Sequence, residues 1–193
     1  MVKTPRILAF GGSLRAGSHN QRLAAIAAEG ARKAGADVTL IALRDFPLPF
    51  YDQDLEDESG MPENAAKLKA LFDAADGFLI ASPEYNSSYT AALKNTIDWV
   101  SRATSDDEPP LSVFKGKTAA ILAASPGGYG GARSLIALRT LLGNIQVTVL
   151  GDQVTVPKVH EKTGPGGRIE DPELVAEIEG LGAKLAAALQ TDA

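Results

Sequence analysis

Short apolar runs alternate along this chain with longer segments of helical character. Runs of continuous apolar residues indicate strands that are covered on both faces, as in a parallel sheet. The pattern predicts strands at residues 6–10, 38–43, 77–82, 117–124 and 146–150, the last extended by 154–156. It predicts helices at about 20–34, 62–74, 90–102 and 131–142, and a last helix that opens at 171–173.

The alternation predicts the fold class. Residues 1–193 are expected to form a single α/β domain, flavodoxin-like and doubly wound, with a five-stranded parallel sheet of order 2-1-3-4-5 and helices on both faces. No helix is predicted between the second strand and Gly60, a segment with Pro47, Pro49 and many acids. Ligands of such sheets lie beyond the carboxyl ends of the strands, where the strand order reverses. The loops after the first, third and fourth strands therefore matter most.

The loop after the first strand is rich in glycine and hydroxyl groups and runs directly into a helix. Ser18 is well placed to cap that helix, and Gln21 is expected to complete a capping box. Free backbone amides and the helix dipole favour an anion at this end. Ser13, Ser18 and Asn20 can add neutral hydrogen bonds, and Arg15 can add charged ones. This loop predicts a cradle for a phosphate monoester, and the alternative is an ordinary turn before a capped helix.

The type of phosphate ligand follows from what the same loop lacks. Gly12 and Gly17 have the glycine spacing of a Walker A loop, but Ser18 stands where that loop requires lysine. The dinucleotide pattern G-x-G-x-x-G is also absent. A single terminal phosphate is therefore the better fit.

Two further loops suit a flat ligand. The loop at 82–89 gathers an aromatic ring, an amide, an acid and hydroxyl groups, and can lay Tyr85 and backbone amides along a planar heterocycle. Its alternative role is to cap the next helix through Ser87 or Ser88. The loop at 125–131 has four glycines in its last five positions, which favours close approach to a ligand, or else a flexible turn. A phosphate at the first loop and a flat polar ring at these two predict FMN.

Composition excludes several other kinds of chemistry. The net charge of −5 disfavours nucleic acid as a partner, because phosphate backbones need clustered lysine and arginine. The absence of cysteine excludes disulfides, iron–sulfur clusters and thiolate zinc sites. His19 and His160 lie far apart in the sequence, so no metal site is predicted. The apolar run 7–10 is too short for a signal peptide or a membrane span, and a cytoplasmic protein without membrane attachment is expected.

Four stretches of the sequence carry a resemblance to a known family. They are GGSLRAGSHN (11–20), LPFYDQDLE (48–56), SPEYNSSYTAALKNTIDW (82–99) and SPGGYGGARS (125–134). Through them the chain resembles the NAD(P)H-dependent FMN reductases, a group that includes chromate, quinone and azo-dye reductases. The resemblance implies bound FMN, NADPH or NADH as co-substrate, and a homodimer or homotetramer. The segment 48–56 and the helix near Thr90 are its candidate interface elements.

The resemblance also assigns roles to the three loops. In the family the first motif binds the FMN phosphate, the Pro-Glu-Tyr-Asn loop packs by the isoalloxazine, and the Ser-Pro-Gly-Gly loop lies near the phosphate or the ring edge. No catalytic acid or base stands out, so none is predicted. The predicted cofactor-binding residues are Ser13, Arg15, Ser18, Asn20, Gln21, Pro83, Glu84, Tyr85, Asn86, Ser125, Gly127 and Gly128.

The flavin would carry the expected reaction. A nicotinamide would stack on the open ring face and give hydride to N5, and a small acceptor (free flavin, quinone, azo compound or metal ion) would then replace it in a ping-pong cycle. Backbone amides of 84–86 and 127–128 are expected to stabilise charge on the reduced ring. The alternatives are a flavodoxin-type carrier, which binds FMN without oxidising nicotinamide, and a flavin-free protein that acts through interactions.

Overall fold

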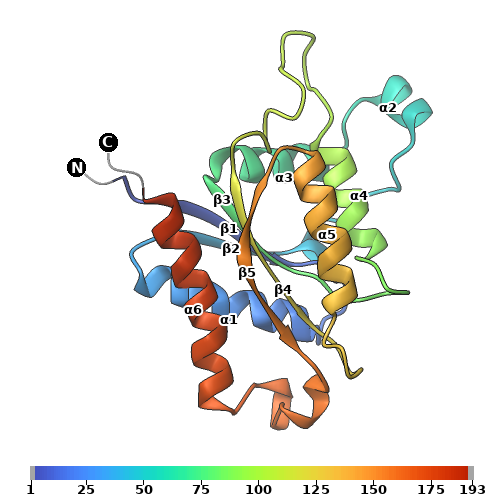
Figure 1. Ribbon diagram of the computed structural model, residues 1–193. Helices are drawn as coiled ribbons and strands as arrows, with labels where there is room; N and C mark the ends of the chain where they lie inside the picture. Colours follow the sequence, from blue (N-terminus) through green and yellow to red (C-terminus); the bar gives the residue numbers. More distant parts are fainter. Residues whose placement is uncertain (1–2, 191–193) are drawn as a thin grey trace.

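Five parallel strands form the centre of this computed structural model, which describes residues 3–190 (Figure 1). Their order is β2-β1-β3-β4-β5, as predicted from the sequence. All neighbouring pairs are parallel, so the five carboxyl ends lie at one edge of the sheet. The strands are β1 (Arg6–Gly11), β2 (Asp37–Ala42), β3 (Gly77–Ala81), β4 (Thr118–Ala124) and β5 (Thr148–Val156).

Helices cover both faces of the sheet, which confirms the predicted fold class (Figure 1). The helices α1 and α6 pack on one face, and α3, α4 and α5 pack on the other. Of the residues 3–190, no helix is long and apolar enough to reach across a lipid bilayer. The helices that cover the sheet are α1 (His19–Lys33), α3 (Glu63–Ala74), α4 (Ala91–Val100), α5 (Ala132–Asn144) and α6 (Pro172–Leu189).

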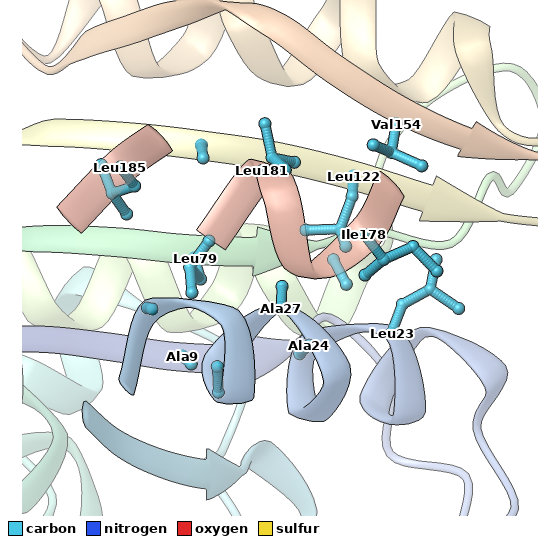
Figure 2. Packing of buried hydrophobic residues seen from close by; sticks show 14 of the residues in the cluster. Ala9, Leu23, Ala24, Ala27, Leu79, Leu122, Val154, Ile178, Leu181 and Leu185 are labelled. Carbon is cyan, nitrogen blue, oxygen red and sulfur yellow. The ribbon is translucent and has the colours of Figure 1, made fainter. Parts of the chain in front are cut away.

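The core has two halves, one on each face. On the α1–α6 side, Leu79 and Leu122 of the central strands are fully buried with Ile178 of α6 (Figure 2). Burying a leucine side chain completely contributes about 1.5–3 kcal/mol to folding. On the other side, the Phe72 ring lies 5.1 Å from Phe78 and 5.7 Å from Phe114, centroid to centroid. The sheet is therefore apolar on both faces, which leaves its carboxyl edge for polar chemistry.

Two glycines let α1 and α6 come into backbone contact. A Cβ at Gly30 would lie 1.9 Å from the carbonyl oxygen of Glu179, and one at Gly182 would lie 1.8 Å from that of Ala27. No side chain fits at either position, so these helices pack more closely than larger residues would allow.

One helix, α2 (Gln53–Ser59), was not predicted from the pattern. None of its residues is buried, so it lacks the apolar period that reveals a helix. The Asp52 carboxylate caps it by accepting a hydrogen bond from the Asp54 amide at 3.0 Å. Local capping thus forms a helix in a segment where hydrophobic periodicity indicates none.

The last strand also differs from the expectation. The first predicted piece, 146–150, begins two residues too early, and residues 148–150 form one continuous strand of nine residues with the predicted extension 154–156. Its register against β4 shifts between Ala119 and Ile121, which accommodates the polar residues in its middle.

Candidate functional site

The loops after β1, β3 and β4 meet at the carboxyl edge of the sheet around a cavity of about 250 Å³. The cavity lies where the strand order reverses, between β1 and β3. Most of the predicted cofactor-binding residues line it, while Ser18, Gln21, Asn86, Gly127 and Gly128 do not. The lining residues are Ser13, Arg15, His19, Asn20, Pro83, Glu84, Tyr85, Ala124, Ser125 and Pro126.

The first loop has the donors of an anion cradle. Ser18 caps α1 as predicted, because its Oγ accepts a hydrogen bond from the Gln21 amide at 3.2 Å. The Ser13 Oγ is held in the same loop by the Arg15 amide at 3.3 Å. Among residues 3–190, the exposed Arg15 guanidinium forms no salt bridge. Four other arginines do form one: Arg6, Arg32, Arg102 and Arg133.

Several backbone amides of this loop also lack partners. The Gly12 amide donates to Ala81 and the Ser18 amide donates to Arg15. Within the described part of the chain, no acceptor is found for the amides of Ala16, Gly17 and His19. Because they lie at the start of a 15-residue helix, these donors suit a phosphate.

Asn20 and Gln21 connect the loops through their side-chain amides. The Asn20 Nδ2 donates to the Ala124 carbonyl, and its Oδ1 accepts from the Ala124 amide, both at 2.9 Å. The Gln21 Oε1 accepts from Gly11 at 2.9 Å and its Nε2 donates to Ile41 at 2.8 Å. The capping box predicted for Gln21 is therefore wrong, because its side chain bridges β1 and β2 instead of returning to Ser18.

The second loop forms a tight turn at the rim of the cavity. Tyr85 and Ser88 exchange backbone hydrogen bonds of 2.9 and 3.1 Å. Asn86 and Ser87 between them have φ angles of 51° and 65°, as in the tight turns of hairpins. The Tyr85 side chain is 55% exposed, so its ring is available at the rim.

Thr90 caps the helix that follows this turn. Its Oγ1 accepts from the Leu93 amide at 3.1 Å and donates to the Gly12 carbonyl at 2.5 Å. The alternative of capping by Ser87 or Ser88 is therefore wrong. Thr90 also fastens the second loop to the first.

Glu84 fastens the second loop to the third. Its carboxylate accepts from the Arg133 amide at 3.1 Å, from the Arg133 Nε at 2.8 Å and from the Ser134 amide at 3.4 Å. Gly131, the N-cap of α5, has no side chain to do this, so Glu84 satisfies the first amides of that helix. The Glu84 carboxylate thus points to α5 although the residue lines the cavity.

The glycines of the third loop fall into two kinds. A Cβ at Gly130 would lie 2.6 Å from the Pro157 nitrogen, and one at Gly131 would lie 2.5 Å from the Ala123 Cβ, so packing requires both. A Cβ at Gly128 would meet nothing within 4 Å, and one at Gly127 would meet only the Ser125 Oγ at 3.6 Å. The space in front of Gly127 and Gly128 is free for a ligand edge.

His19 lines the cavity but was not among the predicted site residues. Its Nδ1 is buried and has no hydrogen-bond partner within residues 3–190. Burial lowers the pKa of the imidazole, and the positive charges of Arg15, Arg22 and His160 lower it further. The signal for it in the sequence was its place between Ser18 and Asn20, both of which were predicted to bind the cofactor.

These features fit one flat ligand with a single phosphate. At the proposed phosphate end lie amides, a guanidinium and an imidazole nitrogen that have no partner within residues 3–190. An exposed tyrosine lines the cavity at the other loop, and two open glycines directly follow Pro126 of its lining. FMN has this shape and charge. Of the described residues, no three His, Asp or Glu side chains come together in a metal site.

Comparison with known families decides the identity. Residues 5–161 match the model of a family described as NADPH-dependent FMN reductase. The chain belongs to the NADPH-dependent FMN reductase family. The predicted cofactor, electron donor and reaction class are confirmed: this FMN reductase family member is an oxidoreductase that passes electrons from NAD(P)H through FMN to an acceptor.

Individual relatives agree with this assignment. A probable NADPH:quinone oxidoreductase 2 of Oryza sativa is 33% identical over 182 residues, 93% of this chain and 86% of the relative. An NAD(P)H-dependent FMN reductase of Pseudomonas aeruginosa is 36% identical over 167 residues, 86% of this chain and 85% of the relative. The solved structure of a flavoenzyme NAD(P)H:(acceptor) oxidoreductase from Paracoccus denitrificans has a TM-score of 0.78 and 26% identity, over 96% of this chain and 97% of that one.

Proposed function

We propose that this FMN reductase family member binds one FMN in the cavity at the carboxyl edge and passes electrons from NADPH to a quinone-type acceptor. One observation carries the proposal: three loops converge on one cavity, and hydrogen-bond donors of the first loop have no acceptor within residues 3–190. The acceptor class is supported by a relative from Escherichia coli named quinone reductase, 36% identical over 169 residues. The rice relative with a quinone in its name supports the same class.

The three loops have separate roles in this proposal. Ser13, Arg15 and the free amides ahead of α1 hold the phosphate. Pro83, Tyr85 and Asn86 lie beside the isoalloxazine, and the backbone from Ser125 to Gly128 follows its polar edge. Four residues position these loops through contacts to the chain: Ser18, Asn20, Gln21 and Glu84.

The protein's contribution to the reaction is orientation and electrostatics. Bound FMN supplies hydride acceptance at N5 and electron donation to the acceptor. The loops hold one ring face open for nicotinamide and then for the acceptor, and such positioning contributes about 7–11 kcal/mol in favourable cases. The backbone amides of Glu84, Asn86 and Gly128 stabilise negative charge on the reduced ring. The expected role of the Tyr85 and Gly127 amides is wrong, because they donate to the Ser88 carbonyl and to the Ser125 Oγ. No side chain is assigned as a catalytic acid or base.

Absorbance tests the proposal directly. The purified protein should be yellow, and its flavin absorbance should bleach when NADPH is added without oxygen. Steady-state NADPH oxidation with a quinone then separates a reductase from a flavodoxin-type carrier. A colourless protein that neither binds added FMN nor oxidises NADPH would contradict the proposal.

We also propose that the chain works as a homodimer or homotetramer. A second hollow, of about 380 Å³, is lined mainly by apolar side chains that include Leu14, Phe46 and Leu48. Next to it along the chain, Phe50 is 79% exposed, and Leu14 itself is 57% exposed. Exposed apolar groups of this kind mark interfaces between chains. Light scattering after size-exclusion chromatography measures the assembly, and cell fractionation tests the expected cytoplasmic location.

A further inference from the structure

His19 is the side chain of the cavity that the proposed function leaves without a role. It occupies the first position of α1, directly after the Ser18 cap. Its ring lines the cavity, and its buried Nδ1 has no partner among residues 3–190. Buried polar atoms in native proteins nearly always have a partner in the protein, a water or a ligand. This nitrogen therefore indicates that something else completes the site.

The charged groups that face His19 come from three elements and are cationic or can become so. Arg15 lies in the loop before α1, Arg22 lies in α1, and His160 lies in the short 3₁₀ helix Val159–Glu161. Burial and these groups favour the neutral imidazole in the free protein.

The nearby acids are engaged elsewhere. The Glu84 carboxylate is bound to Arg133 and to the first amides of α5. The Glu161 carboxylate lies 3.5 Å from the Lys158 Nζ and 3.8 Å from the His160 Nε2. The side of the cavity at His19 is therefore positive, although the whole chain is negative.

We propose that His19 binds the FMN phosphate and takes up one proton from water when the dianionic phosphate enters the cavity. The inference rests on the proposed function, because that function places the phosphate here. A phosphate dianion reverses the local field, and an opposite charge within about 4–6 Å favours the protonated imidazole. A protonated ring donates from both nitrogens, so the phosphate and its water can supply the partner that Nδ1 lacks. One proton moves from solvent to the ring, and no other bond changes.

Proton NMR can observe this step without any change at His19. The chain has only two histidines, so its ring Cε1 protons give two titrating signals, and a His160→Gln variant identifies them. We expect FMN to move the His19 titration up by about one pH unit or more. Riboflavin, which lacks the phosphate, should leave it in place. A His19 titration that FMN does not move would overturn the inference.

Calorimetry measures the same proton independently. FMN binding to the apoprotein is followed in two buffers of different ionisation enthalpy above about pH 7, where free phosphate monoesters are already dianionic. The wild-type protein should take up protons, and its affinity should fall about three- to tenfold between about pH 7 and pH 8.5. In His19→Gln both effects should disappear, whereas His160→Gln should keep the proton uptake.

The outcomes separate this inference from the proposed function. Equal proton uptake in the wild type and in His19→Gln, with FMN bound by both, would overturn the role of His19 and leave the function intact. Failure of the wild-type protein to bind FMN at all would overturn the function itself. Circular dichroism of His19→Gln confirms that the variant is folded, and the NMR titration decides the matter if it is not.

Discussion

Two polar clusters in this molecule differ in how their hydrogen-bonding groups are used. Around Lys69, the groups satisfy one another: the Lys69 Nζ pairs with Glu108 at 2.5 Å and also donates to the Arg102 carbonyl. Glu108 accepts further bonds from the Thr104 amide at 2.8 Å and from the Ser112 Oγ at 2.6 Å. At the carboxyl edge of the sheet, by contrast, a guanidinium, several amides and an imidazole nitrogen have no partner within residues 3–190.

The difference shows how polar groups divide between stability and binding. A closed network stabilises the fold, because each group that lost water gained a partner. A cluster that is left open leaves its groups free to bind a ligand. Changes at the two clusters should therefore affect different measurements.

Arg15→Ala should produce the largest effect on binding. It removes the charged hydrogen bond that we propose Arg15 donates to the FMN phosphate, so we expect FMN affinity to weaken by about 1.5–3 kcal/mol. The free energy of unfolding of the apoprotein should change little. Quenching of flavin fluorescence gives the affinity, and Arg168→Ala, at an exposed arginine that does not line the cavity, is the matched control. Unchanged affinity would remove Arg15 from the phosphate site.

Glu108→Gln should show the opposite pattern. It keeps the shape of the side chain but leaves the buried Lys69 ammonium without its counter-charge, which costs about 1–3 kcal/mol of stability. FMN affinity should be unaffected. Urea unfolding measures the loss, with the exposed Asp107→Asn as control. A variant as stable as the wild type would show that this network contributes nothing.

Acid should weaken the closed cluster in a defined range of pH. Burial alone would raise the pKa of Glu108, but hydrogen bonds from Lys69, Ser112 and Thr104 outweigh it and hold the pKa at about 2, below the ordinary 4.5. A lowered carboxyl pKa contributes stability that is complete above pH 4.5 and is lost as the pH falls toward 2. The difference in unfolding free energy between wild type and Glu108→Gln should therefore shrink over that range. A constant difference would contradict the lowered pKa.

Gly128→Ala should have the smallest effect on the stability of the apoprotein. Comparing it with Gly131→Ala separates binding from packing within one loop. The new Cβ would meet no atom of residues 3–190 within 4 Å, so apoprotein stability should stay equal or rise by about 0.4–1 kcal/mol. FMN affinity should fall, because the methyl group fills the space that the ring edge needs. Thermal unfolding and fluorescence quenching measure the two quantities. Gly131→Ala, with φ of 91°, should instead destabilise the apoprotein.

Sequence reasoning predicted the sheet and the three loops because both depend on strong local signals. Continuous apolar runs marked the strands, and each of the three loops followed the end of a strand. The cap at Ser18 and the start of the last helix at Asp171 were also predicted, and in the structure both side chains accept hydrogen bonds from the first amides of their helices. The helix α2 was missed because it buries nothing.

The partners of individual side chains were beyond the sequence. Asn20 binds the end of β4, 104 positions later, and Glu84 binds the start of α5, 49 positions later. Such pairs exist only once the strands are in register. Residues 11–20 and 82–89 indicated a polar site, but not which of their side chains face the ligand and which hold the loops. His19 shows the same limit, since only the folded chain reveals that its Nδ1 has no partner.

The glycine contact between α1 and α6 has a consequence for the distant end of α1. Backbone-to-backbone packing at Gly30 and Gly182 holds one half of α1 against the last helix, and the loop ahead of its other end carries the amides that we propose bind the phosphate. The ordering of that end is therefore completed during folding, and binding does not have to supply it. A bulkier residue at Gly182 would touch no reacting group. It would, however, leave the loop ahead of α1 less ordered before its ligand binds.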